Sequence, residues 1–334
     1  TRGSILIDGM PTAGKKTYQV NRMGVARTFQ NIRLFKELSV IDNIKVGLHE
    51  SMKYDLASSL IRLPNYWKEE KHCTERAFEL LDIFHMADMA YTQAGSLPYG
   101  AQRRLEIMRA LATSPKLLLL DEPLSNLDAK LRNQMRAELI KLRHEIKGTF
   151  IYVTHDQTEA MTLGDRIVVM KDGVVQQIAT PQEVFNHPAN IFVAGFIGVP
   201  QMNFFDAQLV RSGNGFTVKT EDMNVALAPE TCAQLALNWD GGDVKEITAG
   251  VRPEQILLAD KDEEGALQGT VEVTELMGST EHVHVTAPDG QFVLIIPVVD
   301  LEAKGALKAG DPIWFKFEKN ATHLFDKVSG KNLI

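Results

Sequence analysis

The stretch from Leu117 to Pro123 constrains the fold more than any other part of this 334-residue chain. It reads LLLLDEP, four leucines followed by two carboxylates. A continuous apolar run bounded by Pro115 and Asp121 is typical of a strand buried on both faces of a parallel sheet. The next such run, FIYVT at Phe150–Thr154, ends at His155. We therefore expect two buried strands in one sheet.

A helix is expected between these strands. Over residues 128–147, apolar side chains recur in steps of three or four, at Leu131, Met135, Leu139, Leu142 and Ile146. The alternation of helix and strand over residues 105–155 predicts an α/β domain. Because parallel strands end at the same edge of a sheet, we expect His155 to lie beside Asp121.

The residues before this region predict two short strands and a helical segment. The strands are expected at Ser4–Asp8 and Gly24–Phe29. Residues 31–113 are rich in strong helix formers and predict a mostly helical segment. A hairpin is expected over residues 166–179, turned by Lys171-Asp172-Gly173.

The pattern changes near residue 205. Short β-like runs then alternate with Gly, Asn and Asp turns: GFTVKT, GTVEVTEL, HVHVTA, FVLIIP and PIWFKF. This pattern predicts an all-β second domain, either a small barrel or a sandwich. We therefore expect an α/β domain over residues 1–204 and a β domain over residues 205–334.

Composition narrows the class of protein. Apolar residues make up 44% and charged residues 24% of the chain, as in soluble globular proteins. No apolar run approaches the roughly 18 residues of a membrane span. The net charge of −7 argues against broad nucleic-acid binding. Cys73 and Cys232 match no metal or redox spacing, so they are expected to be reduced thiols.

Several polar features carry chemistry when they are taken together. A strand that ends in Asp121-Glu122 is a Walker B arrangement, in which the first carboxylate holds Mg²⁺ and the second polarises the attacking water. The helix that follows Gly100 would favour an anion at its N-terminus. Each feature alone also fits an ordinary surface carboxylate, helix cap or strand-end histidine. Their order from Gln30 to His155 favours a nucleotide site.

This order resembles the nucleotide-binding subunit of ABC transporters. ARTFQ would supply the Q-loop glutamine, Gln30, and LPYGAQRR stands at the signature, whose usual form is LSGGQ. The resemblance implies that two subunits sandwich two ATP molecules, each between one Walker A and the other subunit's signature. Leu97, Gly100 and Gln102 would then belong to the signature's nucleotide contacts.

The same resemblance assigns the other site residues. LLLLDEP corresponds to Walker B, SNLD to the D-loop and VTHD to the switch histidine. Glu122 and His155 would be catalytic, and Asp121 together with Gln30 would hold Mg²⁺. Ser125 and Asp128 would contact the nucleotide from the D-loop. The implied cofactors are ATP and Mg²⁺.

The segment GMPTAGKKT, Gly9–Thr17, is a near-match to Walker A. Gly9, Gly14 and Lys15 fit the pattern, but Lys16 stands where a Ser or Thr hydroxyl should bind Mg²⁺. In the family a strand like SILID follows Walker A. We therefore interpret the segment as an exposed basic turn and expect the true Walker A upstream of Thr1, so that this chain alone binds ATP weakly and hydrolyses it poorly or not at all.

The resemblance has two parts. Residues 1–123 resemble the ATPases of branched-chain amino-acid importers, and residues 124–334 resemble those of maltose and glycerol-phosphate importers. The second type carries a C-terminal regulatory domain of oligonucleotide/oligosaccharide-binding type. The signature departs from LSGGQ at Pro98, Tyr99 and Ala101, and loss of one preorganised donor costs roughly 10²–10³ in rate.

The leading hypothesis is therefore an ATP-hydrolysing subunit of a bacterial-type ABC importer, for sugar or glycerol phosphate rather than branched-chain amino acids. It implies a homodimer or paired ATPase subunit, membrane permease subunits, and indirectly an extracytoplasmic solute-binding protein. It places the chain at the cytoplasmic face of the inner membrane. The alternatives are a branched-chain amino-acid importer ATPase, a non-hydrolysing regulatory module and, disfavoured by the net charge, a DNA-repair or translation ATPase of the same superfamily.

Overall fold

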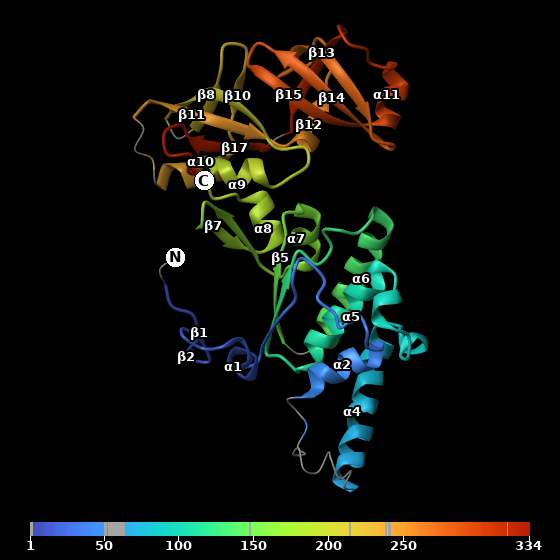
Figure 1. Cartoon of the computed structure of the whole chain (residues 1–334). Coiled ribbons are helices and arrows are strands. Elements are labelled where there is room, and N and C mark those ends of the chain that lie inside the picture. Colours follow the sequence, from blue (N-terminus) through green and yellow to red (C-terminus); the bar gives the residue numbers. More distant parts are fainter. Residues whose placement is uncertain are drawn as a thin grey trace. The chain divides into compact units, whose positions relative to one another are not determined.

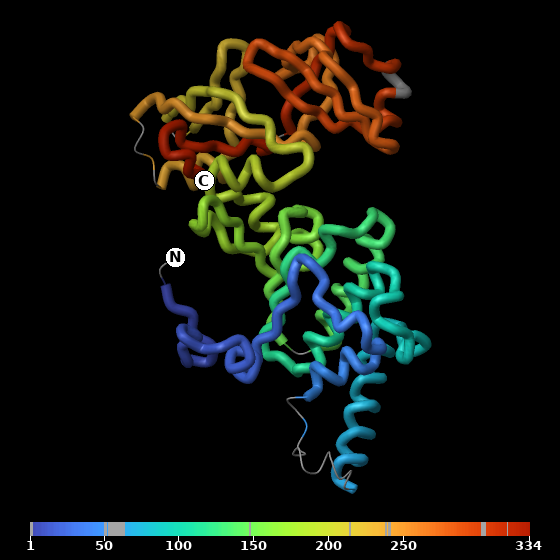
Figure 2. Tube along the Cα trace, viewed as in Figure 1, coloured from blue at the N-terminus to red at the C-terminus, as the bar shows by residue number. Residues whose placement is uncertain are grey.

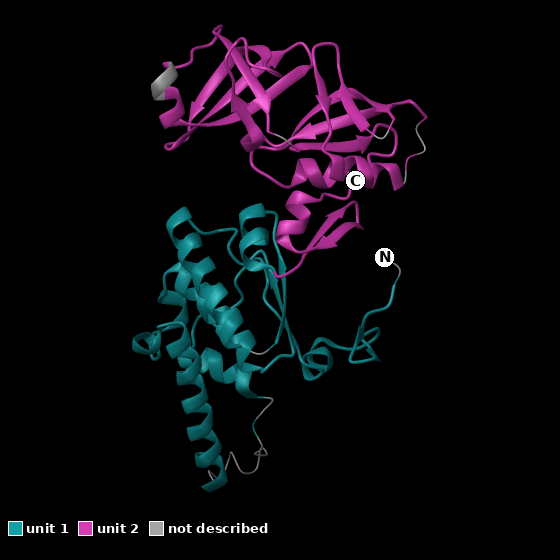
Figure 3. Cartoon of the chain, turned by 180° about the vertical axis from the view of Figure 1, so that it is seen from behind, with its two compact units in different colours: residues 1–164 teal, residues 165–334 magenta. Residues whose placement is uncertain are grey.

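The chain divides into two compact units, Thr1–Gly164 and Asp165–Ile334, which Figure 3 distinguishes by colour. The computed structural model describes residues 3–49, 52, 64–146, 148–213, 215–237, 239, 242–318 and 320–334. The domain boundary expected between residues 204 and 205 lies inside the second unit. It stays a prediction about where the β-rich domain begins.

The first unit contains a three-stranded parallel sheet. Its strands are β3 (Val25–Arg27), β4 (Leu117–Asp121) and β5 (Thr149–Val153, labelled in Figure 1), in the order β3-β4-β5. β4 and β5 pair in parallel register, with Asp121 opposite Val153. The expected pairing of the two strands is therefore confirmed, and their carboxyl ends lie at one edge.

Burial of these strands differs from the expectation. In β4, Leu118 and Leu120 are each 2% exposed. In β5, Ile151 is 44% and Val153 is 45% exposed, so the prediction that this strand is buried on both faces is wrong. The opposite face of β5 packs on the core through Phe150 and Tyr152, but no described layer covers the face that bears Ile151 and Val153.

Helices dominate the segment between β3 and β4, as expected. The chain leaves β3 through an irregular loop, which the tube of Figure 2 shows in blue, and enters α2 (Val40–Leu48). At the start of α2, Ser39 Oγ accepts the Asp42 N–H at 3.2 Å. The helices α4 (Pro64–Ile83) and α5 (Tyr99–Ala112) follow, with the 3₁₀ turns η2 (Ala87–Met89) and η3 (Ala94–Ser96) between them. The part of the prediction that covers residues 50–51 and 53–63 lies outside the described residues.

Two capped helices flank β5 in the sequence. α6 (Ala129–Glu145) begins at Asp128, whose Oδ1 accepts the Leu131 N–H at 3.0 Å. Its expected apolar face is confirmed, because Met135, Leu139 and Leu142 are buried and Leu131 and Ile146 pack against the same core. α7 (Gln157–Leu163) begins at Asp156, which caps the Glu159 N–H at 3.1 Å.

The N-terminal segment differs from its prediction. Instead of one strand at Ser4–Asp8, two short strands, β1 (Leu6–Ile7) and β2 (Met10–Pro11), form an antiparallel pair. The turn forms because Asp8 (φ 49°) and Gly9 (φ 76°) adopt left-handed conformations. The structure also has the short helix α1 (Thr17–Arg22), which was not expected from the sequence, and the Lys16 N–H at its start donates to Gln19 Oε1 at 2.8 Å.

The second unit starts with the expected hairpin. β6 (Ile167–Lys171) and β7 (Val174–Ala179) pair antiparallel, and the turn residues Asp172 and Gly173 have positive φ. The short helices α8 (Pro181–Asn186) and α9 (Ile191–Phe196) follow.

Two five-stranded antiparallel sheets form the rest of this unit, which confirms its β-rich character. The first has the order β10-β9-β8-β11-β17 and the second β12-β16-β13-β14-β15. Their bounds are β8 Asn203–Ser212, β9 Gly215–Lys219, β10 Asn224–Ala226, β11 Val244–Val251, β12 Ile256–Leu258, β13 Leu267–Leu276, β14 Thr280–Ala287, β15 Gly290–Pro297, β16 Pro312–Phe317 and β17 Thr322–Asp326. The helical pieces are α10 (Pro229–Leu237), η4 (Pro253–Gln255) and α11 (Val298–Lys304).

A buried arginine fastens α8 and α9 to the β-sheets of this unit. Arg252 is 1% exposed, and its guanidinium donates to the main-chain carbonyls of Phe185 at 2.7 Å, Ala194 at 3.4 Å and Ile197. The same group lies 4.0 Å from the centroid of the Phe185 ring. Gly198 is required beside it, because a Cβ there would lie 2.7 Å from Arg252 Nη1. None of the described helices is both long and apolar enough to cross a bilayer.

Candidate functional site

The carboxylate of Glu122 is held between two other predicted site residues. Gln30 Nε2 donates to Glu122 Oε2 at 2.9 Å, and His155 Nδ1 lies 3.2 Å from Glu122 Oε1. The Glu122 side chain is 25% and the His155 side chain 74% exposed. Three residues that are far apart in sequence therefore meet at the carboxyl ends of β4 and β5, with one side of the group open to solvent.

The main chain at Glu122 is unusual. Its φ is 42°, in the left-handed region that non-glycine residues seldom adopt, at a cost of about 1–3 kcal/mol. Hydrogen bonds at both main-chain groups hold it there: the Glu122 N–H donates to the Val153 carbonyl at 2.9 Å, and the Glu122 carbonyl accepts the Ser125 hydroxyl at 3.0 Å. This conformation turns the chain out of β4 at once, which presents the carboxylate at the strand end.

The neighbouring carboxylate, Asp121, pairs with a cation. Arg27 Nη2 donates to Asp121 Oδ2 at 2.7 Å, and their side chains are 54% and 27% exposed, respectively. Arg27 ends β3, the strand next to β4, so the sheet itself brings the pair together. Sequence analysis did not single out Arg27.

The donor chemistry at this edge fits Mg²⁺. The ion prefers oxygen ligands and is usually bound through one or two carboxylates together with substrate phosphates and water. Asp121 and Glu122 supply carboxylates, and the Gln30 amide supplies a further oxygen. Among the described residues, no group of three or more His, Cys, Asp and Glu side chains is placed to hold a metal ion by itself.

The end of β5 that carries His155 is braced by a buried carboxylate. Glu159 is 3% exposed, and its Oε2 accepts the hydroxyls of Tyr152 at 2.9 Å and Thr154 at 2.7 Å. Burial, followed by the adjacent Glu159 charge, raises the pKa of Tyr152, so its phenol stays a donor. Thr154 Oγ1 also accepts the Asp156 N–H at 2.9 Å, which fixes the main chain on both sides of His155.

The predicted signature residues lie at the start of α5. Leu97 is 6% exposed and belongs to the core. Gly100 is needed for close packing on α6, because a Cβ there would lie 2.6 Å from Leu131 Cδ2. Gln102 Nε2 donates to the Leu97 carbonyl at 2.8 Å. In this conformation all three have structural contacts, and their expected contact with a nucleotide stays a prediction.

The D-loop residues connect the signature to Glu122. Ser125 binds the Glu122 carbonyl, as described above, and Asn126 Nδ2 donates to the Tyr99 hydroxyl at 3.3 Å. Asp128 caps α6 by accepting the N–H of Leu131, the same leucine whose side chain packs on Gly100. Residues 125–128 are therefore connected to the start of α5 through the Asn126–Tyr99 bond.

A second arginine at this site, Arg103, was not expected from the sequence. It is 1% exposed and donates to the Glu122 carbonyl at 3.0 Å. Its spacing of three residues from Glu106, the ideal distance for a pair on one helix face, was the available signal.

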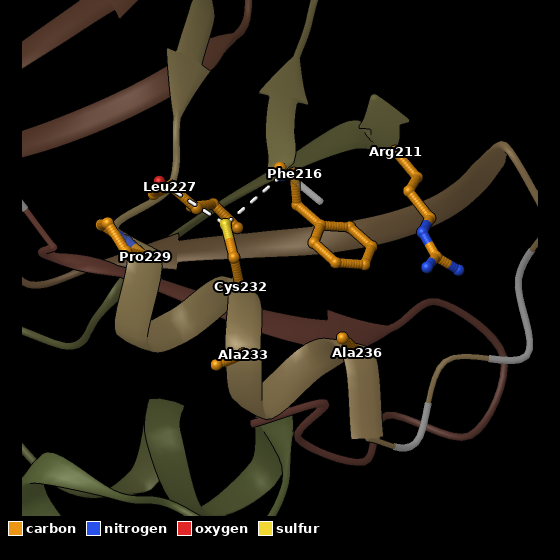
Figure 4. A pocket seen from close by; sticks show the side chains of 8 residues that line it. Arg211, Phe216, Leu227, Pro229, Cys232, Ala233 and Ala236 are labelled. Atoms are coloured by element: carbon orange, nitrogen blue, oxygen red, sulfur yellow. Dashed lines mark hydrogen bonds between the residues drawn. The ribbon is translucent and has the colours of Figure 1, made fainter. Parts of the chain in front are cut away.

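Two hollows lie away from these residues. In the second unit a pocket of about 490 Å³ is lined by Arg211, Gly215, Phe216, Leu227, Pro229, Cys232, Ala233 and Ala236 (Figure 4). There the Cys232 sulfur accepts the Phe216 N–H at 3.3 Å. In the first unit a groove of about 420 Å³ along α2 is lined by Leu38, Asp42, Lys45, Val46, His49 and Met52. No predicted site residue lines either hollow.

Comparison with known proteins identifies the family. The chain is 37% identical to the xylose/arabinose import ATP-binding protein XacK of Haloferax volcanii, over 92% of this chain and 74% of that protein. The chain belongs to the ATP-binding proteins of ABC transporters. This ABC protein is also 36% identical to the oligosaccharides import ATP-binding protein MsmX of Bacillus subtilis, over 90% of this chain and 77% of that one. It is 36% identical to the trehalose/maltose import ATP-binding protein MalK of Thermococcus litoralis, over 93% and 78%.

Family models divide the ABC protein along its length. The ABC transporter model matches residues 1–125, the MalK OB fold domain model residues 198–256 and the TOBE domain model residues 249–325. The expected fold class, an ABC nucleotide-binding domain of P-loop type followed by an OB-like regulatory domain, is confirmed. Membership of an ABC ATPase family implies nucleotide binding and ATP hydrolysis in general, and the roles of individual residues are taken up below.

Proposed function

We propose that this ABC protein is the ATP-hydrolysing subunit of a bacterial-type importer for sugars or glycerol phosphates. Two features support this substrate class: the MalK-type OB domain, and relatives whose names specify import of xylose, arabinose, oligosaccharides, trehalose or maltose. The resemblance of residues 1–123 to branched-chain amino-acid importers finds no support among these relatives.

The observation that carries the proposal is the clamped carboxylate of Glu122. With Gln30 on one oxygen and His155 on the other, it is held in one orientation at the strand end, as a general base needs to be. We assign Glu122 to orienting and deprotonating the attacking water, and His155 to sensing the γ-phosphate. Asp121 and Gln30 would complete the shell of Mg²⁺ and water.

The second half of the site would act on a nucleotide held by a partner subunit. The N-terminus of α5 carries unpaired N–H groups and the positive end of the helix dipole, which favour a phosphate. Leu97, Gly100 and Gln102 position this terminus, and Ser125 and Asp128 lie beside it. Two such chains would therefore form the ATP sandwich as a homodimer or with a paired ATPase subunit.

We propose that Gly9–Thr17 does not bind phosphate. Gly9 and Gly14 both have positive φ, and a Cβ added at either would meet no atom within 4 Å, as in an exposed turn. The helix that follows has six residues, none of them buried. Replacement of Lys15 by Ala is expected to leave ATP affinity unchanged in an equilibrium titration, and a loss of more than about tenfold would assign the phosphate cradle to this segment.

The groove along α2 is the proposed contact with the permease subunits. It combines apolar side chains with the opposite charges of Asp42 and Lys45, a mixture suited to an amphipathic helix. Contact with a permease would hold the chain peripherally at the cytoplasmic face of the inner membrane, with an extracytoplasmic binding protein on the other side. Nucleic acid has no role in this proposal.

The first experiment is Mg-ATP binding and turnover. It compares purified Thr1–Ile334 with a version extended at the N-terminus by the Walker A segment of a sugar-importer relative, each with and without Glu122→Gln. We expect the substitution to abolish turnover of the extended version and to leave ATP binding intact. Turnover that survives Glu122→Gln would contradict the assignment of Glu122 as the residue that orients and deprotonates the attacking water.

The substrate class needs a separate test. The permease subunits that co-purify with the chain from its native membrane can be cross-linked through a cysteine introduced at Val46 and identified by mass spectrometry. Sugar-type permeases are expected. Recovery of amino-acid-type permeases would contradict the proposed substrate class and leave the ATPase assignment untouched.

A regulatory module that does not hydrolyse ATP is the second candidate. It is favoured by the signature, because Pro98 at the start of α5 offers no side-chain cap and the buried Ala101 replaces the usual glutamine. The same titration separates the two candidates. Absence of ATP binding and turnover in the extended version as well would favour the regulatory role.

A further inference from the structure

The side chain of Arg103 joins the two loops that carry Gln30 and Glu122. A guanidinium has five N–H groups, and here they meet five acceptors. These are the Glu106 carboxylate and the main-chain carbonyls of Phe29 at 2.6 Å, Pro123 at 2.8 Å, Glu122 at 3.0 Å and Gln30 at 3.4 Å. Since Arg103 is 1% exposed, water does not compete for these bonds.

Glu106 completes the connection from one turn further along α5. It is 2% exposed, and its Oε2 pairs with Arg103 while its Oε1 accepts the Arg33 N–H at 3.2 Å. The pair therefore binds the irregular segment 29–33 at three main-chain groups: the carbonyls of Phe29 and Gln30 and the N–H of Arg33. The segment has no helix or strand of its own to fix it.

We propose that Arg103 is a positioning residue for ATP hydrolysis, which sets the distance between Gln30 and Glu122 through their main chains. Its planar, rigid guanidinium group, the fork, transmits a displacement of one loop to the other. It also supplies one of the contacts that hold Glu122 at its left-handed φ. Glu106 neutralises the buried charge and orients the fork. The role in hydrolysis rests on the proposed function, whereas the role in fixing the two loops does not.

Arg104 provides a matched control on the same helix. It forms two bonds of 2.8 Å with Glu138 of α6 and is 21% exposed at its side chain. Lysine keeps the charge at either position but supplies three donors from a single nitrogen, so it cannot reproduce the five-acceptor arrangement. Both substitutions keep the charge on α5, but only Arg103→Lys removes bonds to the two loops.

Two measurements test the proposal on the ATP-hydrolysing extended protein. We expect Arg103→Lys to lower kcat about 10- to 100-fold with KM for ATP changed less than about threefold, because small misplacements of reacting groups cost this much. Arg104→Lys should stay within about twofold. Amide hydrogen exchange in residues 28–33 and 121–125 should accelerate more than about tenfold in Arg103→Lys alone.

Equal effects of the two substitutions, or a change confined to KM, would overturn the role of Arg103. If Arg103→Lys does not fold, Glu106→Gln carries the test, since it keeps the shape and an acceptor for Arg33 but loses the charge. Glu106→Gln should also lower kcat and accelerate hydrogen exchange in the two loops, by smaller factors than Arg103→Lys. Normal kcat together with normal exchange would refute the proposal. If the unsubstituted protein lacks ATPase activity, the proposed function fails, while hydrogen exchange still decides whether Arg103 fixes the loops.

Discussion

At the scale of single residues, His155 owes its position to its neighbours rather than to burial. Its own side chain is largely exposed, and the buried group nearby is Glu159, which binds the hydroxyls on β5. The histidine can therefore exchange the Glu122 carboxylate for another partner without disturbing the core. This freedom suits a residue that would respond to the presence of a γ-phosphate.

Replacement of His155 by Ala should accordingly affect turnover and not stability. We expect kcat for ATP to fall roughly 10²-fold, the usual contribution of a positioned proton-transfer or hydrogen-bonding group. The midpoint of thermal unfolding should change by no more than that of His144→Ala, an exposed histidine on α6. A large stability loss in His155→Ala alone would mean that the residue is structural.

His323 gives the second residue-scale prediction. Burial lowers its pKa from 6.5 to about 4, and the positive charges of Arg252 and His187 lower it further in the same direction. In the unfolded chain His323 is therefore protonated below about pH 6.5, whereas in the folded protein it stays neutral down to about pH 4. Stability should be fully present above pH 6.5 and fall by on the order of 3 kcal/mol towards pH 4.

The measurement is the urea midpoint of the second unit's unfolding between pH 4 and 7.5. His323→Gln, which cannot be protonated in this range, should flatten the profile relative to the unsubstituted protein. His282→Gln serves as the control, because it makes the same substitution on a different strand of the same unit, β14. A steep profile that survives in His323→Gln would assign the pH dependence to other groups.

At the scale of elements, α2 and α5 approach closely at Gly47. A Cβ there would lie 2.5 Å from the Arg109 carbonyl oxygen and 2.9 Å from Ala112 Cβ. Because α5 also carries Arg103 and the signature segment, this contact links the groove on α2 to the candidate site. Closer packing of two helices is possible only where one of them has no side chain.

Gly47→Ala should therefore destabilise the first unit. An alanine in an open helix position would gain about 1 kcal/mol over glycine, whereas overpacking here should cost about 2–3 kcal/mol. Urea unfolding measures the change, with Val46→Ala as the control, since Val46 is 44% exposed on the same helix. A stabilised Gly47→Ala would show that α2 can shift away from α5 at no cost.

The sequence was sufficient to predict the elements that carry a strong local signal. The leucines of β4, the apolar spacing of α6 and the Asp172-Gly173 turn each specify their structure through neighbours in sequence. The burial of β5 could not be predicted in this way, because it depends on which layers cover the sheet.

The same reason explains what was missed at the site. Gln30, Glu122 and His155 could be anticipated from their place at loop and strand ends. Arg103 could not, because its acceptors are main-chain carbonyls of two distant loops, which leave no pattern of side chains. The six-residue helix α1, which starts with a hydrogen bond from the Lys16 N–H to the Gln19 side chain, was also missed.

At the scale of the whole molecule, each compact unit has its own hydrophobic core.

Arg252 belongs to the second unit, where it is the donor for carbonyls of α8, α9 and the residue after α9. Arg252→Met should leave these buried acceptors unpaired and destabilise the second unit by about 3 kcal/mol. Urea unfolding should show a far smaller change, about 0.5 kcal/mol or less, for the exposed Arg211→Met, and equal effects would contradict the fastening role of Arg252.

The two cysteines fall one in each unit, Cys73 on α4 and Cys232 on α10, and both are buried. Burial, with the nearby charge of Glu70, also raises the pKa of the Cys73 thiol, which slows its alkylation in the folded state. The alkylation rate of its own cysteine therefore reports how often each unit opens. Pulse labelling with iodoacetamide, read peptide by peptide, would time the opening of the ATPase half and the β-rich half within a single molecule, with no label or probe added to the sequence.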